Sequence, residues 1–175
     1  MADNLKYATP VNSSNPNNAA ELVVDRTGLT WCVFSSLTGS TAALIPLDNT
    51  IPQNTEGTEV LVLSGIEPRY SSSKIATTVD FPVCYASATV TVIFAVFADS
   101  GADAIAVGTA RTNGASIPFQ ISNTVYVDSW VGSKTLKLRI GNATANTLYY
   151  NRANTANIFQ GIGEYSMTVR EIPQP

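Results

Sequence analysis

The sequence contains no histidine and only two cysteines. Histidine is the commonest general base and the commonest transition-metal ligand, so its absence excludes Ser-His and Cys-His nucleophile pairs within one chain. The sequence also lacks a G-x-S-x-G elbow, a P-loop, a Rossmann glycine pattern and CxxC zinc spacing. Together these absences predict a protein that is not an enzyme and that uses no cofactor and no metal.

Charged residues are also scarce, at 13% of the 175 residues against roughly 25% in an average soluble domain. The net charge is −3, the isoelectric point is near 4.8, and the ten lysines and arginines are scattered, which argues against a nucleic-acid partner. Lys134, Lys137 and Arg139 form the one close group of basic residues, and we expect them to be a solvated face of one strand.

Long hydrophobic runs are missing as well. The longest strongly apolar run, residues 92–98, is far shorter than the ~20 residues that span a bilayer, and the N-terminus has no apolar core of a secretory signal. Yet 45% of the residues are hydrophobic, and the mean hydropathy is +0.10. The apolar excess must therefore be buried inside the domain or between subunits, so we expect an oligomer with no membrane partner.

Residues 1–28 differ in composition from the rest of the chain. The stretch PVNSSNPNNAAE is rich in Asn, Ser and Pro, which favour turns or extended arms over regular backbone pairing. We expect an extended polar arm over residues 1–28 and a single β domain over residues 29–175. Two N-x-S/T sequons, at Asn12 and Asn142, are short enough to arise by chance in an Asn-rich chain.

From Leu29 onward the pattern is that of β-strands, and no segment has a helical apolar stripe. Residues 74–85 alternate strictly, and similar alternation runs through residues 135–140 and 164–170. Pro82 cannot donate to a strand ladder, so the pairing is expected to break or to lie on an edge there. One face of the long strand is predicted to carry Ile75, Thr77, Val79, Phe81, Val83 and Tyr85, and the other Lys74, Ala76, Thr78, Asp80, Pro82 and Cys84.

Two segments are apolar on both faces. In residues 89–98, Ile93 and Phe97 form a second apolar row, and residues 125–131 add Tyr126 and Trp130 to a row of valines. Such a strand is either central in a sandwich or packed against a neighbouring subunit. The turns DSGAD, RTNGA, WVGSK and IGNATAN separate short strands, which predicts an all-β sandwich or jelly roll of roughly 8–10 strands.

Three weak constellations of site residues remain. Glu56, Glu59 and Glu67 are acids of the kind that run glycoside hydrolysis, but polar residues at strand ends are the simpler interpretation. Asp99 and Asp103 in DSGAD offer spaced oxygen ligands for calcium, or the Asx bonding of a hairpin turn. The turn is the interpretation we favour.

The third constellation is a set of aromatic residues that suits either a sugar-binding platform or core and subunit contacts. Core and subunit contacts are favoured because these residues lie in β-patterned segments. Cys32 and Cys84 either pair or stay free, and buried free thiols are favoured in apolar strands. The aromatic set consists of Trp31, Tyr126, Trp130, Tyr149 and Tyr150.

Several short segments, read in order, carry a family resemblance. Residues 48–57 lead into 59–61, a proline turn with serines follows at 67–73, residues 73–75 open the next strand, and 151–172 form a closing strand. In this order the chain resembles the small jelly-roll, tumour-necrosis-factor-like knob and decoration modules of tailed-bacteriophage virions. The likeness runs from about residue 48 to residue 172.

The resemblance implies a homotrimer of jelly rolls around a threefold axis with a structural role in the virion. A strand apolar on both faces, either the one with Ile93 and Phe97 or the one with Tyr126 and Trp130, is then expected near the axis. The chain shows no shaft, heptad pattern or stalk before the likeness begins, so the first expectation is a capsid decoration or cement protein. Such a protein is made in the host cytoplasm, lies on the capsid surface and binds the major capsid protein. The alternative is a receptor-binding knob of a tail or head fibre that contacts a host surface glycan or receptor.

Overall fold

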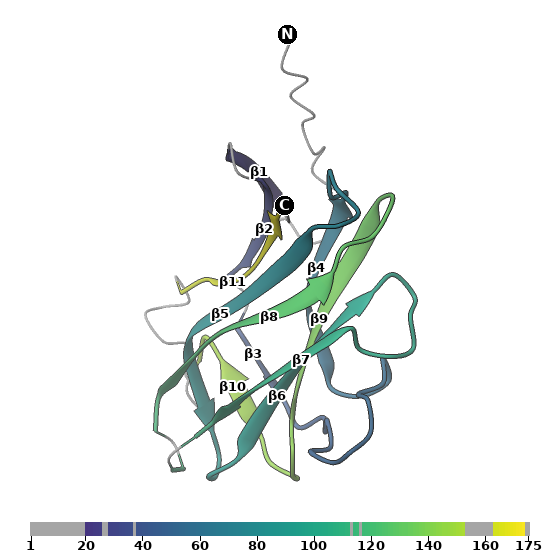
Figure 1. Ribbon diagram of the computed structural model, residues 1–175. Coiled ribbons are helices and arrows are strands. Elements are labelled where there is room, and N and C mark those ends of the chain that lie inside the picture. The colour runs from purple at the N-terminus through teal and green to yellow at the C-terminus, as the bar shows by residue number, and fades with distance from the viewer. Residues whose placement is uncertain are drawn as a thin grey trace, which may run out of the picture.

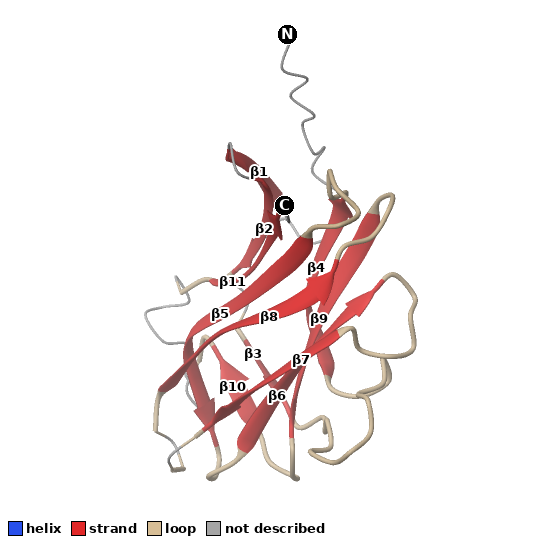
Figure 2. Cartoon of the chain, in the orientation of Figure 1, coloured by secondary structure: helices blue, strands red, loops and turns tan. Residues whose placement is uncertain are grey.

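Every regular element that the computed structural model describes is a β-strand, which confirms the expected all-β fold (Figure 2). Among the described residues, no helix has the length and apolar character of a membrane span. The described residues are 20–25, 28–36, 38–112, 114–115, 117–152 and 163–173, with the backbone alone for 20–25 and 28.

The larger sheet, called sheet A here, is antiparallel and built around one long strand, β5 (Figure 1). One edge of β5 pairs with β11 along its first half and with β10 along its last residues, and the other edge pairs with β8. The strands of sheet A are β1 (Ala20–Asp25), β2 (Gly28–Ser35), β3 (Gly39–Thr41), β5 (Lys74–Ala86), β8 (Phe119–Asp128), β10 (Leu148–Tyr150) and β11 (Tyr165–Ile172).

The smaller sheet, sheet B, is antiparallel in the order β4-β9-β6-β7 and packs face to face on sheet A. Its strands are β4 (Thr58–Ile66), β6 (Thr91–Ala98), β7 (Ala106–Arg111) and β9 (Lys134–Asn142). The edge strands β7 and β8 lie side by side, with Asn123 Nδ2 3.5 Å from the Thr109 carbonyl oxygen (Figure 1). The core between the sheets includes Trp31, Val33, Ile75, Val79, Met167 and Val169 of sheet A and Leu61, Leu63, Phe94, Val96, Leu136 and Leu138 of sheet B.

The long alternating strand is confirmed as β5, but its faces change after Phe81. The pairing with β8 shifts register between Phe81 and Cys84, which leaves Cys84 fully buried and Val83 and Tyr85 half-buried. The prediction that Val83 and Tyr85 continue the inner face is therefore wrong. The change of face follows from Pro82, which has no N–H for the ladder. A bulge forms there, and the later residues turn to the opposite face.

Strand β6 is buried on both faces, as its pattern predicted, but the second face is covered by the chain itself. Ile93 and Phe97 are each 1% exposed and pack with Ile45 on the outer side of sheet B. Residues 42–57, called the covering segment here, lie against this face, with hydrogen bonds from Ile45 N to Asn142 O and from Ala104 N to Pro52 O. The expectation of a subunit contact at Ile93 and Phe97 is wrong, because neither side chain is left exposed for a neighbour.

The region expected to be an arm contributes one strand. Residues 20–25 form β1, which pairs antiparallel with β2 at the edge of sheet A. Residues 1–19, with the Asn12 sequon, lie outside the described residues. At the second sequon, Asn142 is fully buried in β9 and donates to the Asn146 carbonyl oxygen, so the folded chain offers no glycosylation site there.

Candidate functional site

An open groove lies at the end of the sandwich where four strands begin or end. Strand β5 begins and β8 ends on one wall, whereas β6 ends and β9 begins on the other. The cavity measures about 540 Å³. Its lining residues are Lys74, Ala98, Ile105, Tyr126, Val127, Asp128, Trp130 and Lys134.

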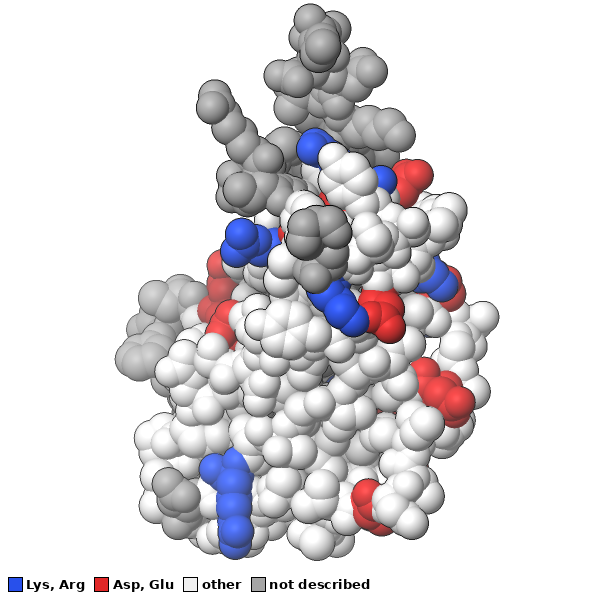
Figure 3. All heavy atoms as spheres, in the orientation of Figure 1, with Lys and Arg blue, Asp and Glu red and all other residues white. Residues whose placement is uncertain are grey.

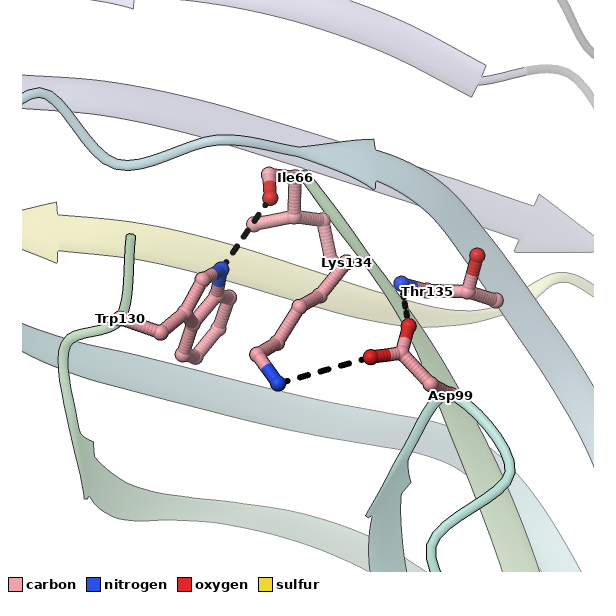
Figure 4. A network of polar contacts seen from close by, with 5 residues as sticks. All are labelled: Ile66, Asp99, Trp130, Lys134 and Thr135. Carbon is pink, nitrogen blue, oxygen red and sulfur yellow. Dashed lines mark hydrogen bonds and ion pairs between the residues drawn. The ribbon is translucent and has the colours of Figure 1, made fainter. Parts of the chain in front are cut away.

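Trp130 is the half-buried aromatic residue of the groove (Figure 4). It packs against the edge of the main core, and its Nε1–H donates to the Ile66 carbonyl oxygen at 3.3 Å. Because a buried indole N–H needs an acceptor, this bond sets the orientation of the ring. Tyr126, in contrast, is 64% exposed and presents its ring to solvent at the end of β8.

Both lysines of the groove have acidic partners within the chain. Lys134 Nζ lies 3.4 Å from Asp99 Oδ2, and Lys74 forms an ion pair with Asp128 (Figure 4 shows the first pair). Asp99 Oδ1 accepts from the Thr135 backbone N–H at 2.9 Å. This hydrogen bond, with smaller contributions from Lys134, lowers the pKa of Asp99, so the carboxylate stays ionised beside Lys134. The groove is therefore close to neutral overall.

Only two of the five candidate aromatic residues meet in the groove. Trp31 is 4% exposed in the main core, and Tyr150 packs edge-on against Tyr165 with the ring centroids 5.7 Å apart. Tyr149 lies under the Arg152 guanidinium, with Arg152 Cζ 5.9 Å from the ring centroid. These three side chains belong to the core or to a separate surface. The favoured interpretation, core contacts, is confirmed for Trp31 and Tyr150, and the alternative of a sugar-binding platform is left with Tyr126 and Trp130.

The acidic candidates are not brought together into a cluster. Glu56 Oε2 accepts from the Gln53 backbone N–H at 2.9 Å, Glu59 lies 3.8 Å from Arg139 Nη1, and Glu67 is exposed. Within the part of the chain that the structure describes, no three His, Cys, Asp or Glu residues are placed to hold a metal ion. Glu56 and Glu59 thus make the contacts of turn and strand-end residues.

Asp99 and Asp103 likewise bind different partners. Asp99 has left-handed backbone geometry, with φ 52°, in the connection between β6 and β7, and its carboxylate contacts Thr135 and Lys134. Asp103 Oδ1 accepts from Gln53 Nε2 at 2.8 Å. The hairpin interpretation of DSGAD agrees with the antiparallel pairing of the two strands.

One member of the basic trio, Arg139, does not lie on a solvated strand face as was expected. Arg139 donates from Nε to the Glu56 carbonyl oxygen at 2.6 Å and from Nη2 to the Gly57 carbonyl oxygen at 2.8 Å. It therefore fastens the covering segment to sheet B, while Lys134 lines the groove. The expectation was wrong for Arg139, because strand periodicity says nothing of a distant segment that folds back over the strand.

One buried carboxylate, Glu171, was missed by the sequence reasoning. Its Oε1 accepts from the backbone N–H groups of Arg69 and Tyr70, at 2.9 and 3.0 Å, and from the Ser73 hydroxyl at 2.9 Å. Glu171 is fully buried, and it therefore ties the proline-serine connection before β5 to strand β11. The signal was present in the sequence, since strict alternation from Tyr165 places residue 171 on the inner face.

The two cysteines are buried and free, which confirms the prediction of unpaired thiols. Cys32 Sγ donates to Thr168 Oγ1 at 3.4 Å, and burial raises the pKa of the Cys84 thiol. A buried thiol with a raised pKa is a poor nucleophile, so Cys84 is not a candidate site residue.

Comparisons with known proteins add no relative. No protein-family model matches the chain, and no curated protein matches its sequence. The groove therefore has to be interpreted from its own chemistry. Two aromatic side chains, two lysines and one aspartate around an open cavity suit the binding of a small polar molecule that also has an apolar face.

Proposed function

We propose that the protein is a structural protein of a bacteriophage virion, a homotrimeric decoration or cement protein that binds the major capsid protein and stabilises the shell. The observation that carries the proposal is the nesting of the strand pairs. Of the eight strands β2, β4, β5, β6, β7, β8, β9 and β11, the first in the chain pairs with the last, the second with the second-last, and so on inward. The pairs are β2 with β11, β4 with β9, β5 with β8 and β6 with β7.

Nested pairs of this kind describe one long antiparallel hairpin rolled into two facing sheets. We interpret this as the eight-stranded jelly roll that the resemblance to virion modules implies. The interpretation rests on long-range pairing and is independent of the short motifs that suggested the resemblance. Fold alone does not define function, so the virion role depends on those motifs and on the experiments below.

The surface proposed for contact between copies is the outer face of sheet A. Across its centre, four uncharged side chains lie in register on four neighbouring strands. The hydroxyl oxygens of Thr78 and Thr124 are 2.8 Å apart, and the Cys32 thiol donates to the Thr168 hydroxyl. In Figure 3, blue and red side chains gather in the upper half of the face seen, and the lower half is mostly uncharged. The row consists of Cys32, Thr168, Thr78 and Thr124.

Localisation and copy number on purified virions test the proposal. A cement protein is expected on the order of hundreds of copies per particle, because it repeats with the capsid lattice. Antibody labelling in negative stain should then mark the shell, and quantitative mass spectrometry should give the copy number. Absence of the protein from virions, or a monomer in light scattering, would contradict the proposal.

The N-terminal residues are proposed to grip the shell. Deleting residues 1–19 leaves β1 and its pairing with β2 in place. We expect the shortened protein to remain a folded trimer but to lose binding to purified capsids in a co-sedimentation assay. Full capsid binding by the shortened protein would contradict this role.

A second candidate function is a receptor-binding knob of a tail or head fibre, and the groove favours it. An open cavity lined by the exposed Tyr126 and by Trp130, whose ring is held by a hydrogen bond, is a surface suited to ligand contact. Antibody labelling of the tail or of a head fibre would select this candidate over the first. The copy number per virion should then be on the order of tens or fewer, as expected for a fibre protein.

A further inference from the structure

We propose that the groove lined by Tyr126, Trp130 and Lys134 is a saccharide-binding site for an uncharged glycan. The inference deepens the second candidate function and rests on it for its biological purpose, because attachment to a host glycan requires such a site. The site lies at the end of β8, two strand residues beyond Thr124 in the row proposed for contact between copies. Residues two apart in a strand point to the same face, so Tyr126 adjoins the proposed contact on the outer face of sheet A, and the groove lies at the end of that face.

The aromatic residues supply the apolar part of the site. A pyranose ring has a face of C–H groups that packs against aromatic rings and an edge of hydroxyls that needs hydrogen bonds. Tyr126, 64% exposed, and Trp130, half-buried, both line the groove. Since the Trp130 N–H is already bonded to the Ile66 carbonyl oxygen, the indole offers the ligand its ring rather than its donor.

The charged residues supply hydrogen bonds of both kinds. Lys74 and Lys134 are donors and Asp128 is an acceptor, which matches sugar hydroxyls because each of these both donates and accepts. All three are ion-paired within the chain: Lys74 with Asp128, and Lys134 with Asp99. No excess positive charge is left for a polyanion, so an uncharged glycan fits better than a uronate or sulfate polymer.

The site is also held in place before any ligand arrives. Asp99, which positions Lys134, is itself bonded to the Thr135 backbone, and the lining residues lie on or beside strand ends (Figure 4). Groups fixed by the scaffold lose little entropy on binding. The volume of about 540 Å³ lies within the roughly 300–1,000 Å³ typical of small-molecule sites.

The experiment is a titration of the full-length protein with defined oligosaccharides, followed by NMR. The probes are uncharged tetrasaccharides of glucose, galactose, mannose and N-acetylglucosamine, with a galacturonate tetrasaccharide as the charged arm. The two tryptophans give two indole N–H signals. We expect at least one uncharged probe to bind with a Kd on the order of 1 mM or tighter. Binding should move the Trp130 signal and leave that of Trp31, which is 4% exposed in the core, in place.

A pair of tyrosine variants provides the matched control. Tyr126→Ala should weaken binding about tenfold or more, whereas Tyr70→Ala, at a tyrosine that is 54% exposed outside the groove, should leave the Kd unchanged. Lys134→Gln should weaken binding by a smaller factor. Unchanged thermal unfolding of each variant shows that the fold is intact.

Three outcomes would overturn the inference: no binding by any probe, binding that Tyr126→Ala leaves unchanged, or binding of the galacturonate probe alone. None of them bears on where the protein lies in the virion. A protein found at fibre tips whose groove binds no sugar would keep the second candidate function and lose the glycan site. A protein found on the shell whose groove binds sugar would keep the glycan site and lose the second candidate function.

Discussion

The outer faces of the two sheets differ in what lies over them. On sheet B, the covering segment brings Ile45 against Ile93 and Phe97, and both β6 side chains are 1% exposed. On sheet A, no described segment lies over the outer face in this way, and Thr124 and Tyr126 remain exposed. An apolar pattern on both faces of a strand can thus be satisfied within one chain. On the outer face of sheet A, Thr124 and Tyr126 remain available for contacts with other molecules.

The largest expected effect comes from placing a charge under the cover. Phe97→Asp puts an unpaired carboxylate among Ile45, Ile93 and Ala95, so we expect a loss of about 4 kcal/mol or more in the free energy of unfolding. Urea unfolding followed by circular dichroism measures it.

The matched change on the outer face of sheet A is Thr124→Asp. We expect the variant chain to remain folded, because the side chain is exposed in the single chain, while light scattering should show loss of the trimer. A folded Phe97→Asp protein, or a Thr124→Asp protein that unfolds, would reverse the contrast between the two faces.

A smaller effect should follow from wedging the cover away from sheet B. A Cβ atom at Gly141 would lie 2.8 Å from Ile45 Cγ1 and 3.0 Å from the Ala43 carbonyl oxygen. Gly141→Ala is therefore expected to cost about 2–3 kcal/mol through overpacking. Gly65→Ala, where φ is 77° but no atom lies within 4 Å, should cost only the backbone strain of about 1 kcal/mol. Equal losses in the two variants would argue against close packing of the cover.

Cutting the polar fastening of the cover should have a similar or slightly smaller effect. Arg139→Met removes the hydrogen bonds to the carbonyl oxygens of Glu56 and Gly57, and we expect a loss of about 2 kcal/mol. Lys137→Met, two residues away on the same face of β9, should change stability by less than about 0.5 kcal/mol. Differential scanning calorimetry of both variants checks the difference, which vanishes if the guanidinium bonds contribute nothing.

The smallest effect concerns the interior that both sheets share. Burial raises the pKa of Tyr165 from 10.0 to about 12, because the ring packs against Phe81 between the sheets. The folded state therefore holds the phenol proton more tightly than the unfolded chain does. This contribution is complete below pH 10 and is lost as the pH rises from 10 to 12, with about 1.4 kcal/mol gone by pH 11.

Urea midpoints measured from pH 8 to pH 11 test this dependence. Tyr165→Phe should flatten the alkaline decline by that amount relative to the wild type. An identical decline in the variant would assign the alkaline loss to other groups of the interior, such as Tyr150, whose pKa burial also raises.

Much of the fold follows from residue patterns that are local. The alternation in residues 74–85, 135–140 and 164–170 predicted β5, β9 and β11, and the turn DSGAD predicted the hairpin of β6 and β7. The face change after Pro82 was missed because period-2 counting assumes an unbroken ladder. At the groove, Tyr126 and Trp130 were among the candidates, but Lys74 was not, since it is far from them in the sequence and its place depends on the pairing of β5 with β8.

The sequence by itself determined that the regular elements are β-strands, that the two cysteines are buried and free, and that β6 is buried on both faces. Each depends on residue type and spacing along a few neighbouring positions, and these act through short-range backbone and burial preferences. The tertiary structure alone decided that the covering segment closes over Ile93 and Phe97, that Glu171 holds the connection before β5, and that four strand ends meet at one groove. These contacts join residues far apart in the chain, so their free energies depend on the packing of the two sheets as a whole.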